Sequence, residues 1–248
     1  MTDRYFVCPP PREDKEDVVL EGPEAHHLIH VMRARAGQRV TLFDGEGCEY
    51  EAEIRQIGRA DVRLAVHCRS EVDRELSREL VLAVALPKAD RHKWLVEKAV
   101  ELGVARLVPL ITHRSVVAAP TKMLHRLGRG VIEASKQCGR NRLMEIAPAQ
   151  PWHEFVEATR AVPHRWLAHP AGAAPEVAWR APVDLAGATA GAGAIVLAVG
   201  PEGGFTSEEV ASATAAGWGA VDLGPRILRV ETAAIALVAL VALAARLA

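Results

Sequence analysis

The stretch AIVLAVGPEGG, at residues 194–204, decides the fold. An unbroken apolar run that ends in a turn rich in glycine and proline is typical of a strand buried in a parallel sheet. Thr206 and Glu209 follow at the spacing of a capping box, which predicts a helix that starts directly after the turn and ends near Gly217. A buried strand, a turn and a helix together form the repeating unit of α/β folds.

The same alternation extends on both sides of this stretch. We expect further strands at residues 80–86, 104–110, 166–168 and 221–223, and further helices at residues 90–102, 121–137, 152–160 and from 232 onward. Asp90 stands where it can cap its helix, and Gly103 stands where that helix ends. Strands that alternate with helices predict a parallel sheet covered on both faces.

Residues 5–70 follow a different pattern. Apolar and polar residues alternate in short runs, which predict strands at residues 38–43, 48–54 and 61–66. One helical segment, at residues 23–33, interrupts them, and the polar residues 70–75 have the composition of a linker. The sequence therefore predicts a small β-rich, barrel-like module followed by an α/β domain.

The composition is that of an ordinary globular protein. The 248 residues are 50% hydrophobic and 25% charged, which suffices for one large or two small domains and excludes a disordered chain. Thirty Lys and Arg against 31 Asp and Glu give a net charge of -1. This balance excludes a uniformly basic coat for nucleic acid, but it leaves a local basic face open.

Cysteines and hydrophobic segments indicate the compartment. The 4 cysteines lie far apart without a CxxC pair, so neither a disulfide scaffold nor a zinc ribbon is indicated. The N-terminus lacks the apolar stretch of a signal peptide. The apolar run at residues 233–245 falls short of the ~20 residues that span a bilayer, so we expect a buried helix there. We expect a cytoplasmic protein without membrane contact.

Three expected loops carry unusual residues after strands, at residues 86–91, 200–205 and 223–229. Ligands of open α/β sheets lie at the carboxyl ends of the strands. Glycines let backbone groups approach a ligand, and the loop at 200–205 leads into a helix N-terminus, which suits a polar or anionic group. When this loop is taken alone, a plain strand-to-helix turn is the more common explanation. Two rigid loops of one sheet favour a shared pocket.

Several familiar catalytic motifs are missing. The chain has no GxxxxGK[ST] and no GxSxG, which disfavours a P-loop NTPase and an α/β-hydrolase. The glycines of residues 191–193 precede their strand, whereas a dinucleotide-binding fingerprint follows one. Cys138 has no identifiable partner base, so a small buried hydrophobe is its more common role.

Two clusters of basic residues are candidate nucleic-acid contacts. Between residues 122 and 142 six Lys and Arg face one acid, Glu133, and Gly139 interrupts the helical pattern there. A solvated helix face and an RNA-binding loop are both open explanations. In the second cluster, at residues 24–35, His26 and His30 lie one helical turn apart, but no third metal ligand is evident. A solvent-facing turn and a surface for RNA phosphates remain its alternatives.

Several ordered motifs resemble those of the bacterial 16S ribosomal RNA uracil-N3 methyltransferases. They are RYFV at 4–7, ALPKADR at 85–91, EKAVELG at 97–103, QCGRNR at 137–142, VGPEGGF at 199–205 and LGPRILRVETA at 223–233. The resemblance covers nearly the whole chain. It implies a PUA-like RNA-binding β-barrel domain at residues 1–70. It also implies a SPOUT-type α/β methyltransferase domain at residues 74–248, whose C-terminal segment forms a trefoil knot.

The resemblance also implies ligands and site residues. Family members bind S-adenosylmethionine in the knot, act on 16S ribosomal RNA of the small subunit and usually work as homodimers without a metal. The implied cofactor-binding residues are Leu167, Ala168, His169, Gly200, Pro201, Glu202, Gly203, Gly204, Leu223, Gly224, Ile227, Leu228 and Arg229. The expected RNA-binding residues are His30, Arg33, Lys88, Arg91, Lys136, Arg140, Asn141 and Arg142. The chain departs from the family at Val230, where Thr is common, and at Met144, where Pro is frequent.

Methyl transfer to uracil N3 requires the ring proton to leave, so a carboxylate or a cation beside the ring would help. Glu202 and Arg229 are the expected catalytic residues, with Glu231 behind them, although a structural salt bridge among these residues is an equal alternative. Two other functions remain open. One is a methyltransferase of the same superfamily that acts on tRNA or another ribosomal base. The other is a non-catalytic RNA-binding protein of ribosome assembly.

Overall fold

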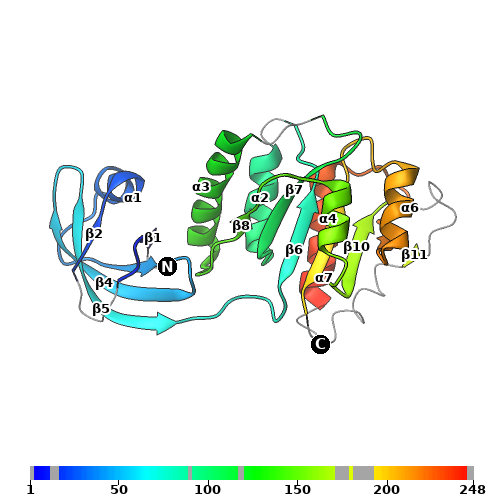
Figure 1. The fold of residues 1–248 in the computed structure, drawn as a ribbon. Coiled ribbons are helices and arrows are strands. Elements are labelled where there is room, and N and C mark those ends of the chain that lie inside the picture. The colour runs from blue at the N-terminus through cyan, green and yellow to red at the C-terminus, as the bar shows by residue number, and fades with distance from the viewer. Residues whose placement is uncertain are drawn as a thin grey trace. The chain divides into compact units, whose positions relative to one another are not determined.

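The computed structural model describes residues 3–11, 17–88, 91–116, 120–170, 179–180 (backbone only) and 193–244 (Figure 1). The chain divides into two compact units. The N-terminal unit consists of residues 1–74 and 135–143, and the C-terminal unit of residues 75–134 and 144–248. Asp90 and residues 191–192, for which the sequence predicts a helix cap and part of a linker, lie outside the described residues.

The N-terminal unit contains a five-stranded sheet in the order β1-β3-β4-β5-β2. Its strands are β1 (Arg4–Phe6), β2 (Asp17–Leu20), β3 (Arg39–Phe43), β4 (Cys48–Ile57) and β5 (Val62–Glu71). β1 pairs with β3 in parallel, and the other pairs are antiparallel. Every second residue at the start of β4 is buried, as the alternation in the sequence predicts. The β-rich module is therefore confirmed, although β5 continues into the expected linker.

One helical segment packs under this sheet. It consists of α1 (Gly22–His26) and a π-helical turn, η1 (His27–Val31), where the sequence predicts a helix at 23–33. Ala25 and Leu28 enter the same apolar core as Tyr5, Leu42 and Tyr50. The segment therefore leaves its polar side, with His26 and His30, exposed to solvent.

Residues 135–143 complete the N-terminal unit from the middle of the chain. They are the last turn of α3 (Thr121–Cys138) and the loop after it. The Leu143 amide donates to the Gly45 carbonyl at 3.0 Å, and Arg142 forms β-bridges with Gly45 and Glu46. No local pattern in the sequence predicts this long-range pairing.

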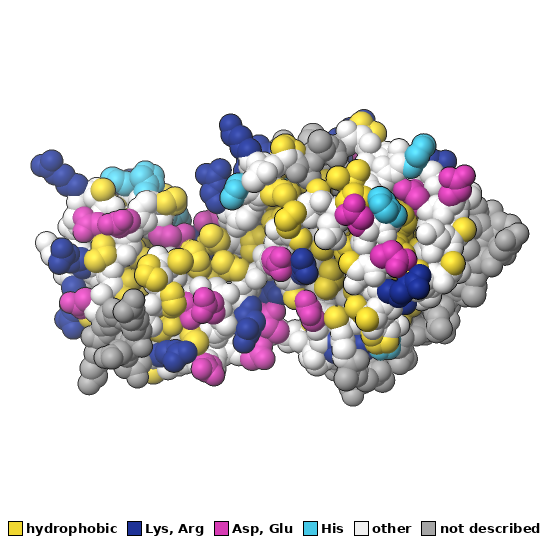
Figure 2. All heavy atoms as spheres, viewed as in Figure 1, with side chains coloured by type: hydrophobic (Ala, Val, Ile, Leu, Met, Phe, Trp, Pro, Cys, Tyr) yellow, Lys and Arg dark blue, Asp and Glu magenta, His cyan; other side chains and the backbone are white. Residues whose placement is uncertain are grey.

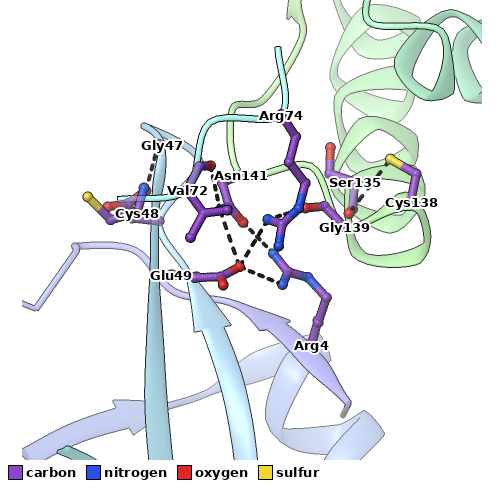
Figure 3. A network of polar contacts seen from close by, with 11 residues as sticks. Arg4, Gly47, Cys48, Glu49, Val72, Arg74, Ser135, Cys138, Gly139 and Asn141 are labelled. Carbon is purple, nitrogen blue, oxygen red and sulfur yellow. Dashed lines mark hydrogen bonds and ion pairs between the residues drawn. The ribbon is translucent and has the colours of Figure 1, made fainter. Parts of the chain in front are cut away.

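A polar network fixes this segment, with the Glu49 carboxylate at its centre (Figure 3). Glu49 Oε2 accepts hydrogen bonds from Arg4 at 3.0 Å, from Arg74 at 3.1 Å and from Asn141 at 3.3 Å. Arg4 also donates to Asn141 Oδ1, and Arg74 donates to the Gly139 carbonyl at 3.0 Å. Burial acts to raise the pKa of Glu49, but these hydrogen bonds outweigh it and lower the pKa below its usual value.

The C-terminal unit is built on an eight-stranded sheet, in which every pairing is parallel. The strand order is β11-β13-β10-β12-β6-β7-β8, and β9 pairs with β7. The strands are β6 (Leu80–Val84), β7 (Arg106–Ile111), β8 (Glu145–Ile146), β9 (Gln150–Pro151), β10 (His164–Ala168), β11 (Trp179–Arg180), β12 (Ile195–Val199) and β13 (Gly219–Val221). All residues of β6 and β12 are buried, as their unbroken apolar runs predict.

Helices cover both faces of this sheet, as expected. The helices besides α3 are α2 (Arg91–Glu101), α4 (Trp152–Ala158), α6 (Ser207–Ala215) and α7 (Val230–Ala244). On one face, residues of α4 and α6 share an apolar core with β6 and β12, and on the other face α7 packs against β6, β10, β12 and α2. Within the described residues, none of the helices combines the length and hydropathy that a membrane crossing requires.

Two local predictions can be compared directly with the structure. The capping box is confirmed, because Glu209 N donates to Thr206 Oγ1 at 3.2 Å and Thr206 N donates to Glu209 Oε2 at 2.8 Å. The strand predicted at 221–223 instead spans Gly219–Val221. It ends early because Asp222 Oδ1 accepts from the Gly224 amide at 2.9 Å and so turns the chain.

The Glu49 network yields a stability prediction. Replacing Glu49→Gln leaves two guanidinium groups without their anionic partner, so the free energy of unfolding of the N-terminal unit should fall by about 1–3 kcal/mol at neutral pH. Because the folded-state pKa is lowered, this contribution is present above the unfolded pKa of the carboxyl and is lost as the pH falls through the folded pKa. The difference in the free energy of unfolding between wild type and variant should therefore vanish in acid.

Hydrogen exchange of residues 39–71 and 135–143, read at several pH values, measures this effect. Glu51→Gln is the matched control, because Glu51 is exposed on the same strand. Equal exchange in Glu49→Gln and Glu51→Gln at neutral pH would contradict the role assigned to the network.

Candidate functional site

A cavity of about 570 Å³ lies at the carboxyl ends of β10, β12 and β13 in the C-terminal unit. Three loops form most of its wall, at residues 168–170, 199–205 and 222–228. Arg114, Ser207, Val230 and Ala233 complete it from the loop after β7, from α6 and from α7. The predicted pairing of the two glycine- and proline-rich loops in one pocket agrees with this geometry. The described residues of the loop at 86–91 do not line it.

Two glycines open the backbone of these loops to a ligand. Gly204 has φ +69° and Gly224 has φ +102°. In this region of positive φ, the backbone of a residue with a side chain is strained. A Cβ at either position would meet no atom within 4 Å. Both residues line the cavity, so peptide groups rather than side chains form part of its wall.

Glu209 holds the loop at 199–205 in place. Besides its role in the capping box, its Oε1 accepts from the His113 amide at 2.8 Å, and its carbonyl accepts from Trp152 Nε1 at 3.1 Å. One carboxylate therefore joins the N-terminus of α6 to the loop after β7. Because α6 begins directly after the glycines, this carboxylate also fixes the end of the cavity wall.

Arg114 reaches the same loop from the other side. Its Nη1 donates to the Gly203 carbonyl at 2.6 Å. A Cβ on Gly203 would lie 3.1 Å from Arg114 Cδ, so glycine permits this close approach. Arg114 itself projects from a tight turn, in which Thr112 N donates to Ser115 Oγ at 2.9 Å and Ser115 N donates to the Thr112 carbonyl at 3.1 Å.

His169 joins the loop after β10 to the end of β13. Its amide donates to the Val221 carbonyl at 3.1 Å, and the residue lines the cavity and is only 7% exposed. Burial lowers the pKa of this imidazole below its usual value, so the ring is neutral at neutral pH. It therefore brings no positive charge to the cavity.

The structure places the expected cofactor-binding residues together, with two exceptions. All of them line the cavity except Leu167, which is buried in the sheet core, and Arg229, which is exposed and whose carbonyl accepts from Ala233 N at the start of α7. Sequence reasoning missed Arg114, whose only signal was its position after an expected strand. It also missed Ser207 and Asp222, which lie outside the expected loops at 200–205 and 223–229 and line the cavity.

The expected catalytic residues separate in the structure. Glu202 is exposed and lines the cavity, whereas Arg229 does not. Glu231 is only 8% exposed and forms an ion pair of 3.3 Å with Arg91. This pair joins the starts of α7 and α2, so a structural salt bridge is the role that the geometry gives Glu231.

The expected RNA-binding residues also fall into two groups. His30, Arg33 and Arg142 are exposed on the N-terminal unit, and Lys88 and Arg91 are exposed on the C-terminal unit. Three others turn inward. Lys136 forms an ion pair of 3.1 Å with Glu24, and Arg140 and Asn141 are 4% and 1% exposed.

The inward position of this second group has a physical cause. The segment that carries these residues packs into the N-terminal unit, where the amide of Asn141 bonds to Glu49 and to the Val72 carbonyl. The side chains of Arg140 and Asn141 are therefore not accessible for a contact with RNA.

Cys138 differs from its prediction. The sequence predicts a small buried residue, whereas Cys138 is exposed. Within the described ranges, no group of three or more His, Cys, Asp and Glu could hold a metal ion.

Comparison with known protein families identifies the class. The model of the RNA methyltransferase domain matches residues 74–242, and that of the RNA methyltransferase PUA domain matches residues 20–65. These two matches correspond to an RNA methyltransferase with an N-terminal PUA domain, the class that the α/β sheet, its cavity and the β-rich module also indicate.

Individual relatives show to which family of RNA methyltransferases the chain belongs. The chain is 32% identical to ribosomal RNA small subunit methyltransferase E of Synechocystis, over 92% of this chain and 73% of that protein. It is 34% identical to the Mycobacterium tuberculosis protein of that name, over 87% and 82%. The chain belongs to the family of the ribosomal RNA small subunit methyltransferases E.

Two solved structures are similar over nearly their whole length. A methyltransferase from Legionella pneumophila, in complex with the cofactor SAM, superposes with a TM-score of 0.86, 30% identity and 97% coverage of both chains. A ribosomal RNA small subunit methyltransferase E from Neisseria gonorrhoeae, bound to S-adenosyl methionine, superposes with a TM-score of 0.83, 30% identity and 96% coverage of both chains.

The brace at Glu209 yields a second stability prediction. Glu209→Ala removes two hydrogen bonds to backbone amides, so the free energy of unfolding of the C-terminal unit should fall by about 1–2 kcal/mol. Glu208→Ala, the change at the exposed neighbour in the same helical turn, should cost no more than about 0.5 kcal/mol. Urea unfolding followed by tryptophan fluorescence measures both, since Trp152 and Trp218 lie in this unit. Equal losses in the two variants would contradict the bracing role.

Proposed function

We propose that this protein transfers a methyl group from S-adenosylmethionine to N3 of a specific uridine in 16S ribosomal RNA of the small subunit. The observation that carries the proposal is the cavity of about 570 Å³ at the carboxyl ends of β10, β12 and β13. Its volume lies within the range of small-molecule sites. The relatives from Legionella and Neisseria, with the same fold, were solved with this cofactor bound.

The residues present fit such a cofactor. The positions of Gly204 and Gly224 leave peptide groups open toward the cavity, where they can bind the polar parts of the ligand. Apolar residues such as Val199, Phe205 and Leu228 supply the rest of the wall. When bound, S-adenosylmethionine supplies an electrophilic methyl group on a sulfonium centre. The three loops would hold it, orient it and keep water away.

Glu202 is the proposed acceptor of the N3 proton. Glu202 lines the cavity and is exposed, so its carboxylate is accessible to a uracil base that enters the cavity. Proton removal leaves a lone pair on N3, which makes the ring nitrogen nucleophilic. Arg229 lies outside the cavity wall, and no step is assigned to it.

The RNA-binding surface is proposed to consist of the exposed cations on each unit. His30, Arg33 and Arg142 serve on the N-terminal unit and Lys88 on the C-terminal unit, whereas Arg91 is exposed but already paired with Glu231. On the face in Figure 2, basic and acidic side chains are interspersed, so these residues would act as local contacts to phosphates and not as part of a basic coat. A substrate of ribosomal RNA also implies work in the cytoplasm.

The C-terminal segment is proposed to form a trefoil knot. β13 lies beyond β10 in the sheet, while the helix that follows it, α7, packs back against β12, β6 and α2. The connection at 222–229 therefore crosses the ends of β10 and β12, where it meets the loop after β12 in the cavity wall. This course supports a chain threaded behind that loop.

The protein is proposed to act as a homodimer. Ile227, in the cavity loop, is 99% exposed, and Leu240 and Leu243 are exposed on α7. Large apolar side chains at such positions support a covered surface in the working enzyme. A second copy would then lie close to the cavity.

Ribosomal RNA from a strain that lacks this gene tests the function. The purified protein and S-adenosylmethionine should restore one primer-extension stop, caused by a methyl group on N3 of one uridine in 16S RNA. Glu202→Gln should lower the rate by about 10²–10³-fold, because it removes the proton acceptor, and should change cofactor affinity far less than the rate. Methylation of tRNA or of another base would favour a different methyltransferase. Absence of cofactor binding in calorimetry would favour a non-catalytic RNA-binding protein.

Salt dependence tests the RNA surface. A plot of the logarithm of RNA affinity against the logarithm of salt concentration has a negative slope. If Arg33 and Arg142 contact phosphates, Arg33→Ala and Arg142→Ala should each make this slope less steep by about 1. Arg55→Ala is the matched control, because Arg55 is exposed on the same unit but forms an ion pair with Glu53. A slope that stays at the wild-type value in both variants would remove these residues from the interface.

A further inference from the structure

A positive charge beside the uracil would help the reaction proposed above, and two arginines, Arg114 and Arg226, line the cavity within the described part of the chain. Arg229, the cation expected from sequence, is not part of the wall. The two candidates differ in how they are held. Arg114 donates to the Gly203 carbonyl at 2.6 Å, whereas the Arg226 side chain forms no hydrogen bond with any described residue.

The position of Arg114 is fixed on both sides. Its turn is closed by the hydrogen bonds between Thr112 and Ser115, and its neighbour His113 is tied to Glu209 at 2.8 Å. The guanidinium is tied to Gly203, yet the side chain remains exposed. A cation that is held in advance and still accessible to substrate costs little reorganisation during a reaction.

The charge of Arg114 also remains available. A guanidinium has five N–H donors, and its bond to Gly203 uses one of them. That partner is a neutral carbonyl. Arg91 and Lys136, in contrast, each form an ion pair with a carboxylate, that of Glu231 and of Glu24 respectively. Among the residues with described positions, no carboxylate forms an ion pair with Arg114.

The partner loop adds a second argument. Gly203 directly follows Glu202, the proposed proton acceptor, and both residues line the cavity with Arg114. A base and a cation are therefore carried by adjoining parts of one wall. This arrangement suits a reaction in which a proton leaves a ring and negative charge builds up behind it.

We propose that Arg114 is a catalytic residue, whose guanidinium donates hydrogen bonds to a carbonyl oxygen of the target uracil and stabilises the negative charge formed as N3 is deprotonated. This role rests on the proposed function. The N3–H bond breaks and its proton passes to Glu202. The electron pair left on N3 then forms a bond to the methyl carbon, as the bond from that carbon to sulfur breaks and its electron pair stays on sulfur.

Single-turnover methyl transfer at saturating RNA and cofactor, measured over a series of neutral to alkaline pH values, tests this role. Arg114→Ala should lower the rate by about 10²–10³-fold at neutral pH, the typical effect of losing a charge-stabilising donor. The loss should shrink as the pH rises, because alkali deprotonates N3 without help. Arg114→Lys should recover part of the rate, because it keeps the charge but not the fork of donors.

Cofactor affinity, measured by calorimetry without RNA, separates chemistry from structure. It should stay within about threefold of wild type in Arg114→Ala, a change of less than 1 kcal/mol. Arg160→Ala is the matched control, since Arg160 is an exposed arginine of the same unit that pairs with Glu157. It should match wild type in every measurement.

Three results would overturn the assignment. They are a wild-type rate in Arg114→Ala, a loss that is equal at every pH, and a loss of cofactor affinity as large as the loss of rate. The last two would reduce Arg114 to a brace for the Gly203 loop. If Arg114→Ala does not fold, the pH profile of Arg114→Lys decides in the same way. Failure of the wild-type protein to methylate N3 would instead refute the proposed function itself.

Discussion

Parallel pairing of β10 with β12 and with β13 makes three distant parts of the chain leave the sheet at one edge. The loops at 168–170, 199–205 and 222–228 must then share a small volume, whatever their own sequences are. The loop sequences determine that peptide groups form part of the cavity wall, because Gly204 and Gly224 adopt a positive φ that residues with a side chain avoid. The cavity therefore follows from sheet topology, and its openness to a ligand follows from glycine.

A cavity made of loops needs support, and the structure provides it through a few polar contacts. Glu209 joins the start of α6 to the loop after β7, and Arg114 joins that same loop to Gly203. The ion pair of Arg91 with Glu231 fixes the start of α7, directly after the loop at 222–228. Each support links segments from different strands. Function and stability are thus coupled, because a residue that holds the cavity loops in place also determines where a substrate can contact them.

The sequence was informative where structure depends on local patterns. Unbroken apolar runs predicted β6 and β12, and the spacing of Thr206 and Glu209 predicted the start of α6. The pocket itself could be predicted because strand ends in a parallel sheet converge. The end of β13 could not, since it depends on a turn closed by the Asp222 side chain.

Roles that depend on long-range partners were not predictable. Asn141 sits in a basic stretch that suggests RNA contact, but its partners Arg4 and Glu49 come from strands more than ninety residues away in the chain. Arg114 carries no motif, and only the folded sheet brings it to Gly203. Arg229 stands beside the correct loop in sequence, yet it falls outside the cavity wall. In each case the sequence shows which residue is charged or polar, but it does not show the distant residue that this side chain contacts.

If the three loops and the turn at Arg114 form one ligand site, a single bound ligand should protect all four segments together. Hydrogen exchange with and without S-adenosylmethionine tests it most directly. We expect the cofactor to slow exchange jointly in peptides covering 112–116, 166–170, 199–206 and 222–230, while peptides of the N-terminal unit exchange as before. Slower exchange confined to one of these loops, or found only in the N-terminal unit, would contradict it.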